Sequence, residues 1–523
     1  MEEKRPAVTA EPAQSVLETE IGTGQGFPGG APGTARPFRV FTNIGLLSGS
    51  QLLTWSLTIA WTLFVPRLIG PYGMGLIVIA TATAGILVGV AGLGARPMLV
   101  KEIAADPTRA PQLLGTAFIV RAALILPAGA LTLIYVHLAG FERGQSLAVY
   151  LGFGIASFTL IAEVAQAGLQ GIERMEYQAS GEVLNKAVQT MVGIPMALLG
   201  LGAISLIVLQ VAGAALLTAL NLAWVRRFRI DWRLNLGRIY SFLSDSISYW
   251  SFAIFSTFYL WVDATMLSLM TPGQVVGWYG VPTRIFQTLM FVPVILSTAW
   301  LPRLAGAYAL GPDNLKKAAR LPLELVTVMS LPIAVGVALV ARPVMLLIYG
   351  PTYEPSIPVL EVLAITCVPM YINIMVNQVL IASNRQILWT RAMILASLVN
   401  PALNLVLIRY FQAHFGNGAI GSAIAMLVTE AVIVAMGVWV IRRFVDPGMF
   451  WRLSRAVLAT AVMAALAWPA ARLGLVQEVL TGVASFSILV VALRVISGDE
   501  LAQLASLLDR LPIWSRLRER RAA

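Results

Sequence analysis

The sequence FAIFSTFYLWVDATMLSLMTPGQVVGWYGVPTRIFQTLMFVPVILSTAWLPRLAG, residues 252–306, reads as two long apolar runs joined at Thr271-Pro272-Gly273. Adjacent proline and glycine mark a chain reversal, and each run is long enough to cross a bilayer as a helix. Asp263 lies in the first run and Arg284 in the second. Because an ionisable side chain inside hydrocarbon is costly, each is a functional candidate. The stretch predicts a membrane-spanning helical hairpin with one charge in each arm.

The composition of the whole chain agrees with this stretch. Of the 523 residues, 58% are hydrophobic and 12% are charged, and the mean hydropathy is +0.78. Since one span needs about 20 apolar residues, we expect an all-α polytopic membrane protein with about 14 transmembrane helices. We place them near residues 40–66, 73–95, 112–138, 146–171, 176–201, 203–226, 242–270, 275–301, 321–341, 357–382, 387–410, 418–441, 455–472 and 478–496.

The positions of the Lys and Arg residues indicate the topology. Most of the 37 fall in the two tails and in the loops that follow even-numbered spans, and we count Lys186 with the loop after span four. The positive-inside rule then predicts an even number of spans with both termini in the cytoplasm. The net charge of +11 reflects this topology, so we expect no nucleic-acid partner.

The ends of the chain differ from the spans. Residues 1–37 are rich in Gly and Pro and hold no apolar run, so we expect a disordered cytoplasmic tail. Residues 446–496 hold two further spans, and residues 497–523 have leucines at helical spacing before a basic end. That last segment predicts an amphipathic helix, either on the inner leaflet or packed on the cytoplasmic loops.

Few residues suit metal or enzyme chemistry. Cys367 is the single cysteine, and His137 and His414 are far apart, so we expect no metal site and no cofactor. The chain has no Walker loop and no soluble segment large enough for a catalytic domain. We therefore expect a protein that is not an enzyme and is not driven directly by ATP.

The sequence contains an internal duplication. LQGIER (169–174) and LIASNR (380–385) are each followed by two spans, which end in VRRF (225–228) and IRRF (441–444). Spans one to six (38–230) and seven to twelve (231–445) therefore predict two six-helix bundles, related by a pseudo-axis along the membrane normal. Two such bundles enclose a central cavity that can open to either side.

Four stretches carry a family resemblance. They are VPRLIGPYG (65–73) with GLG (92–94), QGIERM (170–175), DATML (263–267) with VGWY (276–279) and RI (284–285), and NPALN (400–404) with GAIGSAIA (418–425). Across residues 40–445 the chain resembles the polysaccharide and lipid-linked oligosaccharide flippases, the Wzx-like branch of the MOP transporter superfamily.

This resemblance implies a MOP/MATE-like fold and an inner-membrane flippase for a polyprenyl-pyrophosphate-linked oligosaccharide. Transport would proceed by alternating access and would be coupled to a gradient of H⁺ or Na⁺. The implied partners are the glycan substrate, membrane lipids, a glycan polymerase and glycosyltransferases. The tail before residue 38 and the two extra spans depart from the smallest members, and extra C-terminal helices also occur in relatives that flip peptidoglycan precursor.

The charged hairpin holds the first pair of candidate site residues. Guanidinium groups bind phosphate oxygens through two parallel hydrogen bonds, which makes Arg284 a candidate for the pyrophosphate. Asp263 lies at a similar depth, nine residues before the turn. Two alternatives stay open: Arg284 and Asp263 form a structural ion pair, or Arg284 holds pyrophosphate in one state and returns to Asp263 in the other.

Other polar residues inside predicted spans complete the candidate set. Arg121 and Glu163 form a similar couple in the first bundle, either paired structurally or with Arg121 facing the substrate. Asp263 and Glu163 are candidates for ion coupling, because buried carboxylates in transporters commonly carry the coupling ion. Asn373 and Asn377 are candidates for contacts with sugar hydroxyls, whereas the pair at Asn400 and Asn404 is typical of interhelical contacts.

Two rival functions and a close variant compete with glycan flipping. A multidrug exporter of the MATE branch would have an apolar and acidic cavity, which Arg121 and Arg284 oppose. A non-transporting scaffold for glycan synthesis has no need for ionisable residues inside its spans. A peptidoglycan-precursor flippase would use the same pyrophosphate chemistry.

Overall fold

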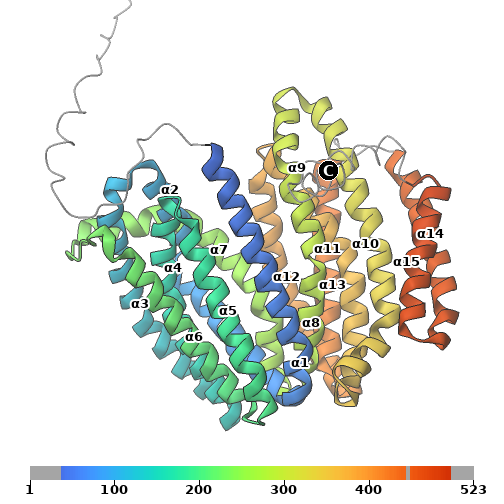
Figure 1. Ribbon diagram of the computed structural model, residues 1–523, viewed down its shortest axis with the longest axis horizontal. Coiled ribbons are helices and arrows are strands. Elements are labelled where there is room, and N and C mark those ends of the chain that lie inside the picture. Colours follow the sequence, from blue (N-terminus) through green and yellow to red (C-terminus); the bar gives the residue numbers. More distant parts are fainter. Residues whose placement is uncertain (1–36, 443–447, 496–523) are drawn as a thin grey trace, which may run out of the picture.

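The computed structural model describes residues 37–442 and 448–495. Every regular element in these two ranges is a helix, and most helices run the full height of the molecule (Figure 1). The all-α prediction is therefore confirmed. The predicted amphipathic helix at 497–523 and the predicted tail, except Pro37 at the start of the first helix, lie outside the described residues.

The helices have the following bounds. They are α1 (Pro37–Ala91), α2 (Ala95–Ala105), η1 (Pro107–Arg109), α3 (Ala110–Ala139), α4 (Arg143–Gly171), α5 (Met175–Leu198), α6 (Gly202–Val225), η2 (Arg226–Phe228), α7 (Leu236–Met270), α8 (Gly273–Leu289), α9 (Phe291–Ala309), α10 (Pro312–Ile348), η3 (Pro351–Ser356), α11 (Ile357–Ala382), α12 (Gln386–Phe415), α13 (Gly418–Ile441), α14 (Gly448–Ala470), η4 (Ala471–Leu473) and α15 (Leu475–Ala492).

Within the described residues, 12 segments are long and apolar enough to cross a membrane, two fewer than the sequence predicts. Spans one and two count once because α1 continues through the turn between them, although Gly70 (φ 70°, ψ 176°) breaks the helical backbone there. Span five is α5, in which Glu182, Asn185 and Lys186 lower the hydropathy. Both differences leave the predicted order of helices in place.

The helices gather in two bundles (Figure 1). α2–α6 lie on one side and α9–α13 on the other, with α1, α7 and α8 between them, and α14 and α15 lie beyond α10. The buried Glu324 of α10 accepts a hydrogen bond from Arg452 of α14 at 3.0 Å and one from Arg320 at 3.0 Å. This ion-pair cluster fastens the two C-terminal helices to the second bundle.

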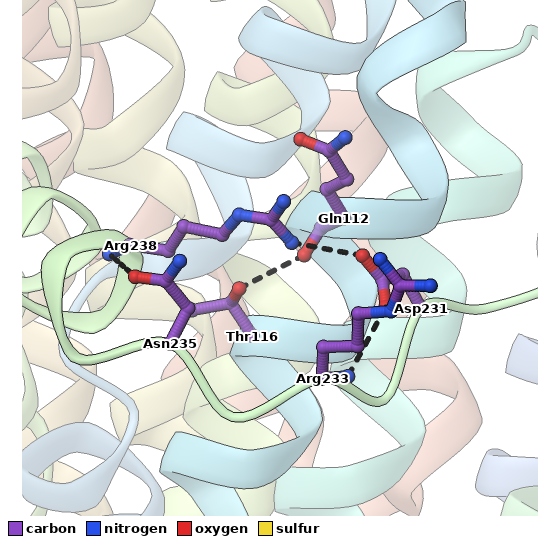
Figure 2. A network of polar contacts seen from close by, with 6 residues as sticks. All are labelled: Gln112, Thr116, Asp231, Arg233, Asn235 and Arg238. Carbon is purple, nitrogen blue, oxygen red and sulfur yellow. Dashed lines mark hydrogen bonds and ion pairs between the residues drawn. The ribbon is translucent and has the colours of Figure 1, made fainter.

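The segment that connects the two bundles is fastened to the N-terminal end of α3, because the backbone N–H of Asp231 donates to the carbonyl of Pro111 at 3.0 Å. Arg238 of α7 donates to the Asp231 carboxylate at 2.8 Å (Figure 2). Asn235 caps α7 by accepting from the backbone N–H of Arg238. The hydrogen bond from Arg238 holds the pKa of Asp231 below its ordinary value, so the contact is lost only as the pH falls into the acid range.

The backbones of the two bundles touch at the end that holds the turns at 70–71 and 271–272, which we call the hairpin end. A Cβ atom on Gly75 would lie 1.9 Å from the carbonyl oxygen of Gly273, and one on Gly277 would lie 1.8 Å from that of Pro71. Only glycine fits at such distances, and small residues are what allow membrane helices to approach closely. We call these four residues the glycine seam.

The glycine seam joins the two hairpins that the duplication relates. α1 contributes Pro71 and Gly75, and α8 contributes Gly273 and Gly277. Farther along α1, Gly85 packs on Trp261 of α7. One apolar core therefore runs through both bundles at the hairpin end.

Candidate functional site: a cavity between the bundles

A cavity of about 470 Å³ lies between the two bundles. α1, α5 and α6 line it from the first bundle, and α7, α8, α11 and α13 line it from the second. Aromatic and aliphatic walls alternate with polar groups that include Gln189, Gln210 and Gln287. A mixed lining of this kind suits a ligand with both apolar and hydrogen-bonding parts.

Arg284, predicted from the sequence to bind substrate, faces this cavity from α8. Its guanidinium carbon lies 4.7 Å from the centre of the Trp61 ring of α1, which is a cation–π contact across the two bundles. Within the described residues Arg284 takes part in no ion pair. Its charge therefore remains available to a ligand in the cavity.

Lys186 lies in the cavity, and its assignment to a cytoplasmic loop was wrong. It is at the middle of α5, within the predicted span five, and it lines the cavity opposite Arg284. The two positive charges act on each other electrostatically. The signal was present in the sequence, because Lys186 lies inside the predicted span 176–201. The site therefore has one cation from each bundle.

Asp263 does not pair with Arg284. Its carboxylate, 6% exposed, accepts a hydrogen bond from the Tyr279 hydroxyl at 3.0 Å and one from Asn404 Nδ2 at 2.6 Å. Asn404 also donates to Asn400 Oδ1 at 2.7 Å. These contacts tie α7 to α8 and α12. The simple ion pair was thus the wrong alternative for this state, and the interhelical role is confirmed for Asn404, while Asn400 contacts Asn404 within α12.

Arg121 and Glu163 form the predicted ion pair in the first bundle. Arg121 Nη2 lies 3.4 Å from Glu163 Oε2, and Arg121, only 1% exposed, also donates to the carbonyl of Ala91. Neither side chain lines the cavity. Arg121 and Glu163 are therefore paired in the state described here, and the substrate-binding role of Arg121 stays a prediction.

Asn373 lies behind the cavity wall. It is 3% exposed and donates through Nδ2 to the carboxylate of Glu430, a residue of α13 that the sequence analysis missed. Tyr259 of α7 donates to the other oxygen of the same carboxylate. Asn377 is half-buried on α11, and neither asparagine lines the cavity. Their sugar contacts stay a prediction. Glu430 was identifiable from the sequence as a charge inside span twelve.

The arrangement defines a class of protein: a multi-pass membrane transporter with two helical bundles around a central cavity of mixed apolar and polar lining. The family model described as "Polysaccharide biosynthesis protein" matches residues 40–307, which is just over half of the chain. The chain therefore belongs to the polysaccharide biosynthesis protein family.

Individual proteins agree with this assignment. A probable low-salt glycan biosynthesis flippase, Agl15 of Haloferax volcanii, is 22% identical over 391 residues, covering 73% of this chain and 79% of the relative. The lipid II flippase MurJ in an inward closed conformation superposes with a TM-score of 0.71 at 14% identity, over 86% of this chain and 99% of MurJ. An inward-facing multidrug resistance MATE transporter of the MOP superfamily superposes with a TM-score of 0.56 at 16% identity, over 77% and 98%. The two solved structures establish the MOP-type fold.

Proposed function

We propose that the chain is a flippase that carries a polyprenyl-pyrophosphate-linked oligosaccharide across the inner membrane by alternating access. The observation that carries the proposal is the pair of cations, Arg284 and Lys186, which face one cavity from opposite bundles. The family assignment and the similarity to a probable glycan flippase support it. The chain acts as a transporter rather than an enzyme.

A pyrophosphate group fits this pair of cations. An arginine binds phosphate oxygens through a planar fork, and a lysine adds a mobile point charge. Two like charges in a membrane cavity are costly unless an anion joins them. Because Arg284 and Lys186 belong to different bundles, one pyrophosphate that contacts both would hold the bundles together.

The glycine seam supports the direction of transport. With both termini in the cytoplasm, the hairpin end faces outward, and the seam brings the two bundles together there. A cavity closed on its outer side would accept the lipid-linked glycan from the cytoplasmic leaflet. Opening of the seam would release it to the outer leaflet, where a glycan polymerase takes it over. Glycosyltransferases would supply it from the cytoplasm.

A multidrug exporter is disfavoured by the same cations. The organic cations such a transporter carries would meet Arg284 and Lys186 in the cavity, and like charges repel strongly where water is scarce. A peptidoglycan-precursor flippase shares the pyrophosphate chemistry and the fold of MurJ. Transport assays on defined lipids separate these functions.

In proteoliposomes, we expect the full chain to flip a fluorescent polyprenyl-pyrophosphate oligosaccharide at least about tenfold faster than protein-free vesicles do, a rate ratio worth about 1.4 kcal/mol. Quenching of the dye in the outer leaflet measures the flipping. Lipid II with the same dye is the comparison, and faster movement of lipid II would favour the peptidoglycan alternative. Ethidium transport without movement of either lipid would contradict the proposal.

The coupling ion, H⁺ or Na⁺, is proposed to bind at Asp263. Glu163 is held by Arg121, whereas Asp263 lines the cavity and has only neutral partners, Tyr279 and Asn404, in the contacts described. An ion at Asp263 would change contacts between α7, α8 and α12 together. Such a change links ion binding to the position of the second bundle.

We expect Asp263→Asn to lose ion coupling while retaining the shape of the site. Flipping by the variant should equal that of the unsubstituted chain after its ion gradients are dissipated, and it should no longer respond to a proton or sodium ionophore. The matched control is Glu361→Gln, which neutralises an exposed carboxylate on α11. A variant that responds to ionophores as the unsubstituted chain does would remove Asp263 from the coupling site.

A further inference from the structure

A second buried carboxylate lies in the second bundle, apart from the proposed Asp263 site. Glu430 is at the middle of α13 and is only 2% exposed. It forms no ion pair within the described residues, and its partners there are the Tyr259 hydroxyl of α7 and the Asn373 amide of α11. A charged carboxylate in this position would be expensive without a compensating positive charge.

The surroundings of Glu430 favour a proton over a metal ion. Tyr259 donates to one carboxylate oxygen, and Asn373 donates to the other and to the Glu430 carbonyl. Both lobes of the carboxylate thus face hydrogen-bond donors, which repel a cation. The part of the chain described holds no cluster of three His, Cys, Asp or Glu side chains that suits a metal. A proton neutralises the carboxylate with no change beyond a rotation of the Asn373 amide.

Asn373 supplies an acceptor for that proton. Its amide oxygen is buried and has no hydrogen-bond partner in the described structure, although the residue is only 3% exposed. Rotation of the amide by half a turn would bring this oxygen to the Glu430 carboxyl, where it can accept the O–H. Asn373 can therefore donate a hydrogen bond to the charged Glu430 carboxylate through its nitrogen, and accept one from the protonated carboxyl through its oxygen.

Tyr259 connects Glu430 to the cavity. Its side chain lines the cavity wall, and its hydroxyl contacts the carboxylate behind that wall. A hydroxyl donates and accepts at once, so it can pass a proton between cavity water and Glu430. The charged and titratable groups that face Glu430 are Tyr259 and Asp263, both from α7. Tyr279 of α8 contacts Asp263 through a hydrogen bond from its hydroxyl. α11 and α12 present the amides of Asn373, Asn400 and Asn404.

Asp263 lies one helical turn after Tyr259 on α7, and the negative charges of Asp263 and Glu430 repel each other. We propose that Glu430 is a second proton-binding site, reached from the cavity through Tyr259, and that the Asn373 amide rotates when the proton binds. The role of this proton in driving transport rests on the proposed flippase function. Binding of the proton itself does not.

Infrared difference spectroscopy of the purified full chain in nanodiscs tests the proton site without any glycan. Between acidic and alkaline pH, the unsubstituted protein is expected to show a carboxylic-acid C=O band of a buried group. Glu430→Gln should lose a component of this band that Asp263→Asn and the exposed control Glu361→Gln both keep. A band that is unchanged in Glu430→Gln would overturn the proposal.

Two further measurements test the site if the first variant does not fold or if the bound ion is Na⁺. If Glu430→Gln fails to fold, Tyr259→Phe removes one hydrogen bond and should shift the same band without abolishing it, and an unshifted band would count against the site. Addition of Na⁺ at constant pH should leave the band intact, and its loss would show a metal site instead.

In flipping assays, Glu430→Gln should flatten the pH dependence of the flipping rate. A chain that flips no glycan, with the infrared result as expected, would overturn only the proposed substrate.

Discussion

Replacing Gly277 with alanine is expected to leave the protein inserted in the membrane but to lower flipping about tenfold or more, since overpacking costs about 1–3 kcal/mol and shifts a conformational equilibrium by roughly 5- to 150-fold. The added Cβ would lie 1.8 Å from the backbone carbonyl oxygen of Pro71, which no rotamer change relieves. The glycine seam would then open, and the outward-closed state would lose population. Flipping in proteoliposomes measures the loss.

The matched control for this substitution is Gly306→Ala. A Cβ on Gly306 of α9 would meet nothing within 4 Å, so this variant is expected to flip normally and to gain slightly in helix stability. Cysteine labelling is a second readout, which measures directly whether the glycine seam is open. In a Cys367→Ser background, a cysteine at Thr283 in the cavity wall should react with an outside maleimide faster when Gly277→Ala is present. Normal flipping by Gly277→Ala, with unchanged labelling, would show that the seam does not gate the cavity.

Replacing Arg284 with alanine is expected to lower flipping by at least about 100-fold, because two charge-assisted hydrogen bonds to pyrophosphate are lost, each worth about 1.5–3 kcal/mol. Arg284→Lys should recover part of this loss, since it restores the charge but not the fork. Lys186→Gln should cost less, about tenfold, because a single point charge is removed. Surface polysaccharide in cells and flipping in proteoliposomes both measure the effect.

Controls for the cation pair come from arginines outside the cavity. Arg303→Ala removes an exposed arginine of α9 and should flip normally. Arg121→Ala should lower the amount of folded protein, because it leaves Glu163 without its partner inside the bundle. Normal surface polysaccharide in the Arg284→Ala variant would remove Arg284 from the substrate site.

Several features of the fold could be predicted because they depend on local composition. The apolar runs predicted an all-helical membrane protein, and the repeated pattern predicted two bundles with a cavity between them. Gly70 and the polar face of α5 changed only how the spans are counted. Arg284 was identified as a cavity residue by the same reasoning, because a guanidinium inside a span is costly and therefore marks a functional site.

Partners of the buried polar groups were less predictable. Asp263 and Arg284 lie at matching depths on neighbouring helices, yet Asp263 bonds to Tyr279 and to Asn404, which is 141 residues away in sequence. Depth in a membrane helix follows from counting residues, but the direction of a side chain depends on how each helix is rotated in the bundle. Glu430 shows the same limit, because its two partners come from α7 and α11.

By itself, the sequence determined that this protein is a polytopic helical membrane protein built from a duplicated six-helix unit, with charges inside its spans. These properties follow from hydrophobicity, charge and repetition, which can be read along the chain. Tertiary structure alone decided that Lys186 joins Arg284 at the cavity, that Asp263 and Glu430 occupy separate polar centres, and that the two hairpins touch through glycine. Such contacts depend on helix rotation and on close approach between segments far apart in sequence, which no local pattern encodes.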